Sequence, residues 1–322
     1  MKVIDIINAS ERPFASFELV PPLKGSEVSR LYSSIDPLMQ FRPPFINVTC
    51  HRDEVEYVPN GDGTYTKMTL AKRPGTIAIV AAIMRRYPQL EIVPHVICGG
   101  ASRSKVESEL LDLHFLGIQN VVALRGDAIP GQRYFMPEAD GFSHSSELVA
   151  MISRLNRGQY LDPTVKNGLS TDFCVGVAAY PEKHFEAANL DVDIQHLKAK
   201  VEAGAHYIVT QMFFDNDLYY RFVDRLRQAG VTVPVIPGLK PVSNVRQLDL
   251  LPRSFHIDIP QALVSRLNQT PADAYQVGIE WAIGQSRDLL AHGAPAIHYY
   301  TMAKPDNVCQ IVREVFSDQS TD

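Results

Sequence analysis

The stretch EIVPHVICGGASRSKVESELLDLHFLGIQNVVAL, residues 91 to 124, decides the fold. Its two ends, Glu91–Ile97 and Asn120–Leu124, are short apolar runs, which are typical of parallel strands covered on both faces. Between them, Ser102–Leu116 carries an i, i+3, i+4 apolar stripe that predicts a helix. Gly117 suits the left-handed cap that ends such a helix. The stretch therefore predicts a strand–helix–strand unit of a parallel sheet.

The same unit recurs along the chain. The eight predicted strands are Phe14–Val20, Phe45–Cys50, Glu91–Ile97, Asn120–Leu124, Phe173–Ala179, Tyr207–Gln211, Val233–Ile236 and Ala296–Tyr300. The predicted helical segments are Ser26–Met39, part of Thr69–Tyr87, Ser102–Leu116, Ser145–Leu155, Ile194–Ala203, Leu218–Ala229, Val245–Leu267, Asp273–Ala291 and Asp306–Phe316. Eight alternating units close most economically into a (β/α)8 TIM barrel of the α/β class. We expect residues 1–322 to form one catalytic barrel domain, with extra helices between strands seven and eight.

An open doubly wound sheet is the alternative architecture. The chain contains no GxGxxG and no GxxxxGK[ST] motif, and this favours the barrel over a nucleotide-binding open sheet. The polar segment Asp53–Thr66, with Asn-Gly-Asp-Gly at 60–63, predicts a hairpin after the second strand.

Composition and charge limit the kinds of function. The chain has 31 Lys and Arg against 36 Asp and Glu, a net charge of −5, which argues against binding to nucleic acid or to an anionic membrane. The longest apolar run, Ile77–Met84, is far shorter than the ~20 residues that span a bilayer, and Asp5 falls where a signal peptide would be apolar. The four cysteines show no metal-binding spacing, so we expect structural thiols and no metal. These features predict a cytoplasmic protein.

Glu18 is the first candidate for chemistry. In a barrel the active site lies at the carboxyl ends of the strands, and Glu18 stands there inside an apolar strand. If Phe17 and Leu19 face the helices, the period-two alternation of a strand turns Glu18 into the barrel mouth. Burial would raise its pKa, which makes a carboxyl a useful general acid near neutral pH. The alternative is a structural ion pair, for example with Arg125.

Other strand ends also carry polar residues. The tripeptide Arg125–Asp127 places a cation, a glycine and an anion at the end of the fourth strand. A glycine lets a ligand approach the backbone, and an arginine suits a diphosphate. The alternative is a turn with a local salt bridge. His95 and His184 are weaker candidates, because a lone histidine is more often structural. The Gln211 amide can both donate and accept hydrogen bonds, which suits a heterocycle with both kinds of group, but alone it is weak evidence.

Several ordered motifs together resemble one family. They are Ser16-Phe17-Glu18 with Pro21-Pro22, Leu124-Arg125-Gly126-Asp127, Ala178-Ala179-Tyr180-Pro181-Glu182, Ala203-Gly204-Ala205 with Thr210-Gln211, Ile236-Pro237-Gly238 with Pro241-Val242-Ser243-Asn244, and His298-Tyr299-Tyr300-Thr301. The set, which runs from about Phe14 to Val312, is similar to the methylenetetrahydrofolate reductases, and the chain length resembles their short bacterial type. Each motif alone is modestly specific, whereas the ordered set is highly specific.

The resemblance implies a barrel that binds FAD and reduces 5,10-methylenetetrahydrofolate to 5-methyltetrahydrofolate with NADH or NADPH. Hydride would pass through the flavin in a ping-pong cycle that supplies methyl groups for methionine synthesis. Glu18 matches the general acid that protonates folate N10, and Asp127 matches the carboxylate between flavin and folate. Positions that match flavin contacts are Thr49, His95, Arg125, Gly126, Asp127, Ser145, Tyr180, His184, Ala187, Asp193, His196 and Lys200. Positions that match substrate contacts are Asp127, Gln211, Gln247 and Lys304.

Several positions depart from the pattern of that family, and one of these departures, Leu19-Val20 in place of two phenylalanines, changes packing only. His144-Ser145 stands where the family often has an aromatic pair, Ala199 replaces a basic residue, and Leu251 replaces an aromatic that can fold over substrate in some members. Lys304 replaces an arginine, and it can pair with the folate glutamate but not bidentately. The resemblance implies folate and a pyridine nucleotide as partners, with no nucleic acid and no membrane. The nucleotide preference, the physiological direction and a homo-oligomeric state stay open.

Two other kinds of function stay as alternatives. A different barrel enzyme, such as a metal-dependent lyase, would need carboxylates and histidines aimed at one point, and no compact motif of that kind occurs. A catalytically silent flavin- or folate-binding relative would be expected to lose Glu18 or Asp127, and both are present. Absorbance of the purified protein distinguishes a flavoprotein, because bound oxidised flavin is yellow.

Overall fold

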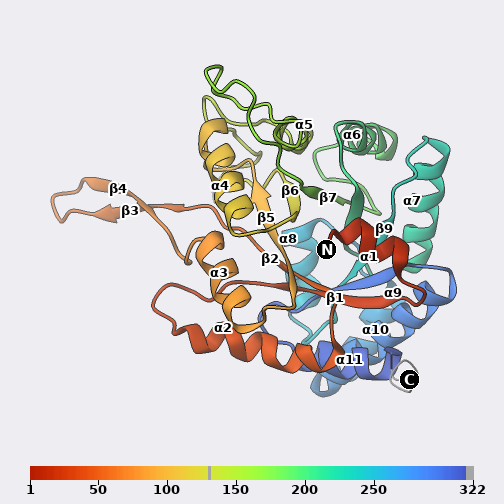
Figure 1. Cartoon of the computed structure of the whole chain (residues 1–322). Helices are drawn as coiled ribbons and strands as arrows, with labels where there is room; N and C mark the ends of the chain where they lie inside the picture. Colours follow the sequence, from red (N-terminus) through yellow and green to blue (C-terminus); the bar gives the residue numbers. More distant parts are fainter. Residues whose placement is uncertain (130–131, 317–322) are drawn as a thin grey trace.

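The structure, a computed structural model, describes residues 1–129 and 132–316. Within these residues, eight parallel strands close into a barrel in the order β1-β10-β9-β8-β7-β6-β5-β2, and helices surround it (Figure 1). The strands are β1 (Phe14–Leu19), β2 (Phe45–Val48), β5 (Glu91–Ile97), β6 (Asn120–Leu124), β7 (Cys174–Ala179), β8 (Tyr207–Met212), β9 (Val235–Leu239) and β10 (Ala296–Tyr300). The predicted (β/α)8 barrel is confirmed, and the open-sheet alternative is wrong.

Helices connect the strands in the predicted order. They are α1 (Val3–Ala9), α2 (Val28–Ile35), α3 (Thr76–Arg86), α4 (Arg103–Phe115), α5 (Ser145–Leu155), α6 (Leu190–Glu202), α7 (Asn216–Gln228), α8 (Gln247–Phe255), α9 (Gln261–Gln269), α10 (Ala274–Ala291) and α11 (Asp306–Phe316), with 3-10 helices at Asp36–Phe41 and Pro271–Asp273. Helices α8 to α10 are the extra helices expected before the last strand. The helical material predicted there divides because His256 adopts a left-handed conformation after α8 and Pro260 starts α9. Over the described ranges, we find no helix with the length and apolar character of a membrane span.

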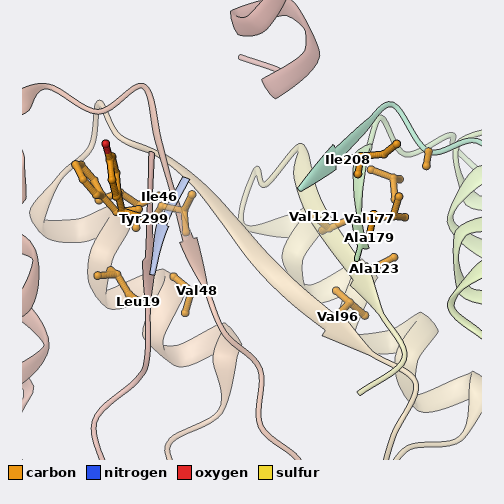
Figure 2. Close-up of a cluster of buried hydrophobic side chains, with 14 of the residues drawn as sticks. Leu19, Ile46, Val48, Val96, Val121, Ala123, Val177, Ala179, Ile208 and Tyr299 are labelled. Atoms are coloured by element: carbon orange, nitrogen blue, oxygen red, sulfur yellow. The ribbon is translucent and has the colours of Figure 1, made fainter. Parts of the chain in front are cut away.

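The main hydrophobic core lies between the barrel strands and the surrounding helices. Figure 2 shows part of it, with Val48 of β2 and Val96 of β5 among the buried strand residues. Phe17 and Leu19 of β1 are both fully buried in this core. Because successive residues of a strand point to opposite faces, Glu18 between them points into the barrel. This is the orientation that the sequence predicts.

Helix α1 is an element that the sequence analysis did not predict. Its Val3 and Ile7 are buried in a second apolar cluster with residues that begin several strands, among them Phe45 of β2 and Tyr207 of β8. The backbone N–H of Val3 also donates to the side-chain oxygen of Asn120 at 2.8 Å. Because these residues mark the amino ends of the strands, α1 closes the end of the barrel opposite the predicted site.

The predicted hairpin forms between β2 and α3. Its strands, β3 (Glu54–Pro59) and β4 (Tyr65–Leu70), pair antiparallel and project away from the barrel (Figure 1). Tyr57 and Tyr65 are each 65% exposed. Among the described residues, none of this hairpin belongs to a hydrophobic core cluster. The hairpin is therefore an appendage of the barrel rather than part of its wall.

Candidate active site

Glu18 lies near the carboxyl end of β1 with its side chain 14% exposed. Burial raises the pKa of Glu18 from 4.5 to about 8. Its Oε2 is 3.6 Å from Nε2 of His95 on β5. Burial lowers the pKa of His95 to about 3, so this histidine is neutral at pH 7 and the two groups form no ion pair. The alternative partner, Arg125, is bonded to Glu186 instead. Glu18 therefore keeps its proton near neutral pH, as a general acid must.

Polar side chains line the barrel interior around Glu18. Asn47 of β2 lies beside Glu18 in register, and its Nδ2 is 3.3 Å from Nε2 of His95. Oγ of Ser16 is 2.8 Å from Nδ1 of His298 on β10. In the part of the chain that the structure describes, Asn47 Oδ1 and His298 Nε2 are buried without a hydrogen-bond partner. Buried polar atoms are usually bonded, so these two leave capacity for a water or a ligand group.

A second group of predicted residues gathers where β6 and β7 end, with Asp193 from the first turn of α6 and Lys200 from its last turn. His184 donates its backbone N–H to the Asp193 carboxylate at 2.8 Å, and its ring meets the Tyr180 ring edge-on at 4.7 Å between centroids. Lys200 of α6 donates to a backbone carbonyl of β7 at 3.0 Å, and burial lowers its pKa to about 8. Asp193 and Arg125 both lie close enough to act electrostatically on Lys200. The structure thus brings five predicted flavin-contact residues together.

The donors in this second group suit the diphosphate of FAD. Arg125 offers a planar fork of N–H groups, and Lys200 adds a second cation within electrostatic reach of it. Gly126 has φ +86°, a conformation that a residue with a side chain rarely adopts, and it leaves the backbone accessible at the strand end. The residues present therefore fit the cofactor that the sequence resemblance implies.

Asp127 is exposed at the rim of the barrel mouth. A guanidinium N–H of Arg52 donates to its backbone oxygen at 3.5 Å, and the charge of Asp127 acts on His51. Arg52 lies against Gly99 and Gly100, where an added Cβ would come within 3.4 Å of it. The Asp127 carboxylate is consequently accessible to a ligand that enters the mouth between β2, β5 and β6.

The other predicted residues lie around these two groups. Oγ1 of Thr49 is 2.9 Å from His51, while Gln211 and Gln247 accept backbone N–H groups at 2.9 and 2.7 Å. Ala187 and Ser145 are buried, whereas His196 and Lys304 are exposed. Within the described residues, seven of the predicted site residues have no direct hydrogen bond or ion pair to Glu18 or Arg125. They are Thr49, Ser145, Ala187, His196, Gln211, Gln247 and Lys304.

Three residues of the site were missed by the sequence analysis. Glu186 bonds Arg125 at 2.6 Å, and the Phe135 ring lies under the Arg125 guanidinium at 5.1 Å from its centroid. Arg52 approaches Asp127 as described above. Arg52 comes two residues after the predicted end of the second strand, and a basic residue so near a strand end was a usable signal for it. Glu186 and Phe135 lie in long loops without periodicity, so nothing local in the sequence connects them to Arg125.

Leu251, one of the departures from the family pattern, is almost fully buried in a third apolar cluster beneath α8. It packs there with core residues such as Leu263 and Val277, so it belongs to the interior rather than to the open mouth. Over residues 1–129 and 132–316, no group of three or more His, Cys, Asp or Glu side chains is placed to hold a metal ion.

A closed barrel with a protonated acid inside its mouth is the architecture of a (β/α)8-barrel enzyme. A comparison with models of protein families identifies the family within this class. The model described as methylenetetrahydrofolate reductase matches residues 2–315, and the chain belongs to that family.

Curated relatives agree with the family. The chain is 32% identical over 294 residues to "5,10-methylenetetrahydrofolate reductase" of Escherichia coli strain K12, an alignment that covers 90% of the chain and 86% of that protein. It is 30% identical to "Methylenetetrahydrofolate reductase 1" of Schizosaccharomyces pombe and 31% identical to "Methylenetetrahydrofolate reductase (NADH) 1" of Arabidopsis thaliana. The alignments cover 95% and 94% of the chain. The chain spans about half the length of the yeast and plant relatives, 46% and 48%.

Solved structures support the fold. A protein described as "Uncharacterized protein from Clostridium thermocellum binds two copies of 5-methyl-5,6,7,8-tetrahydrofolic acid" superposes with a TM-score of 0.56 at 13% identity, covering 98% of this chain and 99% of that one. An oxaloacetate acetylhydrolase superposes with a TM-score of 0.51 at 11% identity, covering 99% of this chain and 87% of that one. At sequence identities this low, the structural similarity shows a shared barrel fold and nothing about function.

Proposed function

We propose that this chain is a flavoprotein that reduces 5,10-methylenetetrahydrofolate to 5-methyltetrahydrofolate with NADH or NADPH. Residues 1–322 act as one catalytic barrel domain in the cytoplasm, and hydride passes through bound FAD in a ping-pong cycle. The observation that carries the proposal is Glu18, a carboxyl inside the barrel mouth whose burial raises its pKa to about 8, in a chain of this family.

Glu18 supplies the proton of the folate half-reaction. Protonation of N10 lets the bond between N10 and the bridging methylene break with N10 leaving as a neutral amine. The methylene then forms an iminium with N5, and a hydride converts it to the methyl group. FAD, when bound, supplies that hydride chemistry. A site that keeps the acid protonated at pH 7 makes the ring opening possible without an external acid.

The other residues position the reactants. Arg125 and Lys200 hold the cofactor diphosphate through charge-assisted hydrogen bonds. Asp127, exposed at the rim, accepts from donor groups of the folate. Gln211 and Gln247 offer amides that both donate and accept, which suits a heterocycle with both kinds of group. Lys304 attracts the negative glutamate portion of folate as a point charge.

The two half-reactions test the role of Glu18. Transfer of hydride from nicotinamide needs no proton at the nicotinamide, whereas opening the methylene bridge does. Glu18→Gln should leave flavin reduction by the nucleotide near normal and slow folate reduction by at least ~10²-fold, the lower end of general acid contributions. Stopped-flow absorbance of the flavin measures each half-reaction separately. Equal slowing of both would mean that Glu18 holds the site together instead of donating a proton.

The cofactor is tested independently of catalysis. The purified protein should be yellow, and acid treatment should release a flavin that co-migrates with FAD on chromatography. Release of FMN alone, or a colourless protein that FAD does not reconstitute, would refute the cofactor assignment. Stopped-flow reduction by NADH and by NADPH in parallel assigns the nucleotide.

A further inference from the structure

Glu186 holds one of the predicted cofactor-binding side chains. Its Oε2 is 2.6 Å from Nη1 of Arg125, and the two side chains are 19% and 20% exposed. The Phe135 ring supports the guanidinium from its face, at 5.1 Å from the ring centroid. Arg125 is therefore fixed between a carboxylate and an aromatic ring, and one of its N–H groups is already engaged.

The Glu186 carboxylate is ionised in this position. Burial alone would raise the pKa of Glu186, but the hydrogen bond and charge of Arg125 hold the pKa below its usual value. Its Oε1 is buried and, within the described residues, has no hydrogen-bond partner. The carboxylate thus presents Arg125 with an anionic oxygen, which is also what a phosphate group would present.

The cations that suit a diphosphate, Arg125 and Lys200, already have carboxylate neighbours. Arg125 pairs with Glu186, Asp193 acts electrostatically on Lys200, and Asp127 is a further anion near Tyr180. A diphosphate brings additional negative charge to this group. Repulsion by the carboxylates opposes its binding, because Coulomb interactions are strong where solvent is partly excluded.

Glu186 is the carboxylate that can move away most easily. Asp193 lies in the first turn of α6 and accepts the backbone N–H of His184 at 2.8 Å, so it is anchored by its helix and its partner. Glu186 lies in the loop between β7 and α6, outside any helix or strand. It can turn aside without breaking the hydrogen bonds of a regular element.

We propose that Glu186 competes with the cofactor diphosphate for Arg125, so that it lowers the affinity for FAD and stabilises the apoprotein. The proposal rests on the proposed flavin-dependent function. Glu186 keeps the guanidinium in place until a phosphate oxygen takes over its bond. The measured affinity for FAD then depends on the difference in free energy between two bonds to Arg125, one from the FAD phosphate and one from the Glu186 carboxylate.

Titration of apoprotein with FAD tests the proposal without measuring catalysis. Quenching of flavin fluorescence gives the dissociation constant after bound flavin has been removed. Glu186→Gln should lower this constant about tenfold, because a charge-assisted hydrogen bond no longer has to be exchanged. The melting temperature of the apoprotein should fall, and FAD should raise it by more than in the wild type.

Two further variants complete the experiment. Glu280→Gln is the matched control. It removes the same charge from another Arg–Glu pair, Arg266–Glu280, whose atoms are 2.7 Å apart on the surface. It should leave the dissociation constant for FAD unchanged. Glu186→Asp keeps the charge but is one methylene shorter, so it should tighten FAD binding by less than Glu186→Gln. If Glu186→Gln does not survive flavin removal, Glu186→Asp alone decides the direction.

Each result has one meaning. Weaker FAD binding by both Glu186 variants would overturn the proposal and show that Glu186 orients Arg125 for the diphosphate. Unchanged binding would also overturn it, while leaving the proposed function intact. If neither the wild type nor Glu280→Gln binds FAD, the flavin-dependent function itself fails, and the competition at Arg125 fails with it.

Discussion

The proton on Glu18 links the chemistry of the site to the stability of the fold. The pKa of Glu18 lies at about 8 in the native state against 4.5 for the free group. Between these two pH values the native protein holds a proton that the unfolded chain releases. Stability contributed by this group is therefore lost as the pH rises from about 4.5 through 8.

This difference predicts how Glu18→Gln changes stability with pH. The amide cannot ionise, so the variant should gain stability over the wild type as the pH rises, on the order of 3 kcal/mol between pH 5 and pH 8.5. Urea denaturation of both proteins at several pH values measures the difference. If the unfolding free energies of the two proteins change with pH in the same way, Glu18 is ionised and solvated in the native state.

Lys240 gives a second prediction at this scale. It follows β9, is 7% exposed, and donates to the adjacent Pro241 carbonyl at 3.2 Å. Burial lowers its pKa to about 8. The wild type therefore gains stability as the pH rises from about 8 to 10.5. Lys240→Met should be more stable than the wild type at pH 7, by about 2 kcal/mol, and should lose this advantage by pH 10.5.

The control for Lys240 is a lysine on the surface. Lys198 of α6 is partly exposed and lies 3.9 Å from Glu202. Surface ion pairs contribute little, about 0–1 kcal/mol, so Lys198→Met should show no stabilisation at pH 7. Thermal unfolding of both variants across this pH range tests the pair. Equal behaviour of the two would mean that the Lys240 ammonium is hydrated in the native state.

The orientation of a site residue could be predicted where it follows from strand alternation, and its partner could not be predicted where the two residues lie in separate loops. The inward orientation of Glu18 follows from strand alternation, because Phe17 and Leu19 beside it are apolar. The pairing of Arg125 with Glu186 depends on two loops that meet only in the folded barrel, so no local pattern contains it. The sequence therefore predicted which side chains stand at the strand ends, but not which of them neutralise one another.

Among the elements, α1 shows where local patterns are insufficient. Its seven residues are too few for a stable isolated helix. It is helical because Val3 and Ile7 fill the amino end of the barrel. Strands β5 and β6 have the predicted bounds, because each is a mostly apolar run that starts at a polar residue, Glu91 or Asn120. The division between α8 and α9 depends on the conformation of His256, which composition does not reveal.

Helix α1 predicts a stability effect far from the active site. Val3→Ala should destabilise the protein by about 2 kcal/mol, because it removes two methyl groups from a fully buried position. Asn8→Ala, at an exposed position of the same helix, should change stability by less than about 0.5 kcal/mol. Chemical denaturation compares the two. A small effect of Val3→Ala would mean that α1 contributes little to closing the barrel.

At the scale of the whole molecule, the barrel and the β3–β4 hairpin should be separable. Most hairpin residues are exposed, and in the described chain none belongs to a core cluster. Replacing residues 54–70 by a short Gly-Ser linker should leave the melting temperature within a few degrees of the wild type, because no core burial is lost. Thermal unfolding followed by circular dichroism measures this. A large loss of stability would show that the hairpin packs on the barrel.

The closing of the barrel by α1 has a consequence for how the protein is made. Helix α1 is synthesised before every strand of the barrel, but the cluster that receives it includes Ala296 of β10. Strand β1 likewise lacks one neighbour until Ser16 can lie opposite His298. Nearly 300 residues must therefore be synthesised first, which takes roughly 15 to 60 s at about 5–20 residues per second. During that interval β1 has an unpaired edge and the cluster that receives α1 lacks Ala296, so this end of the barrel is complete only after β10 has been synthesised.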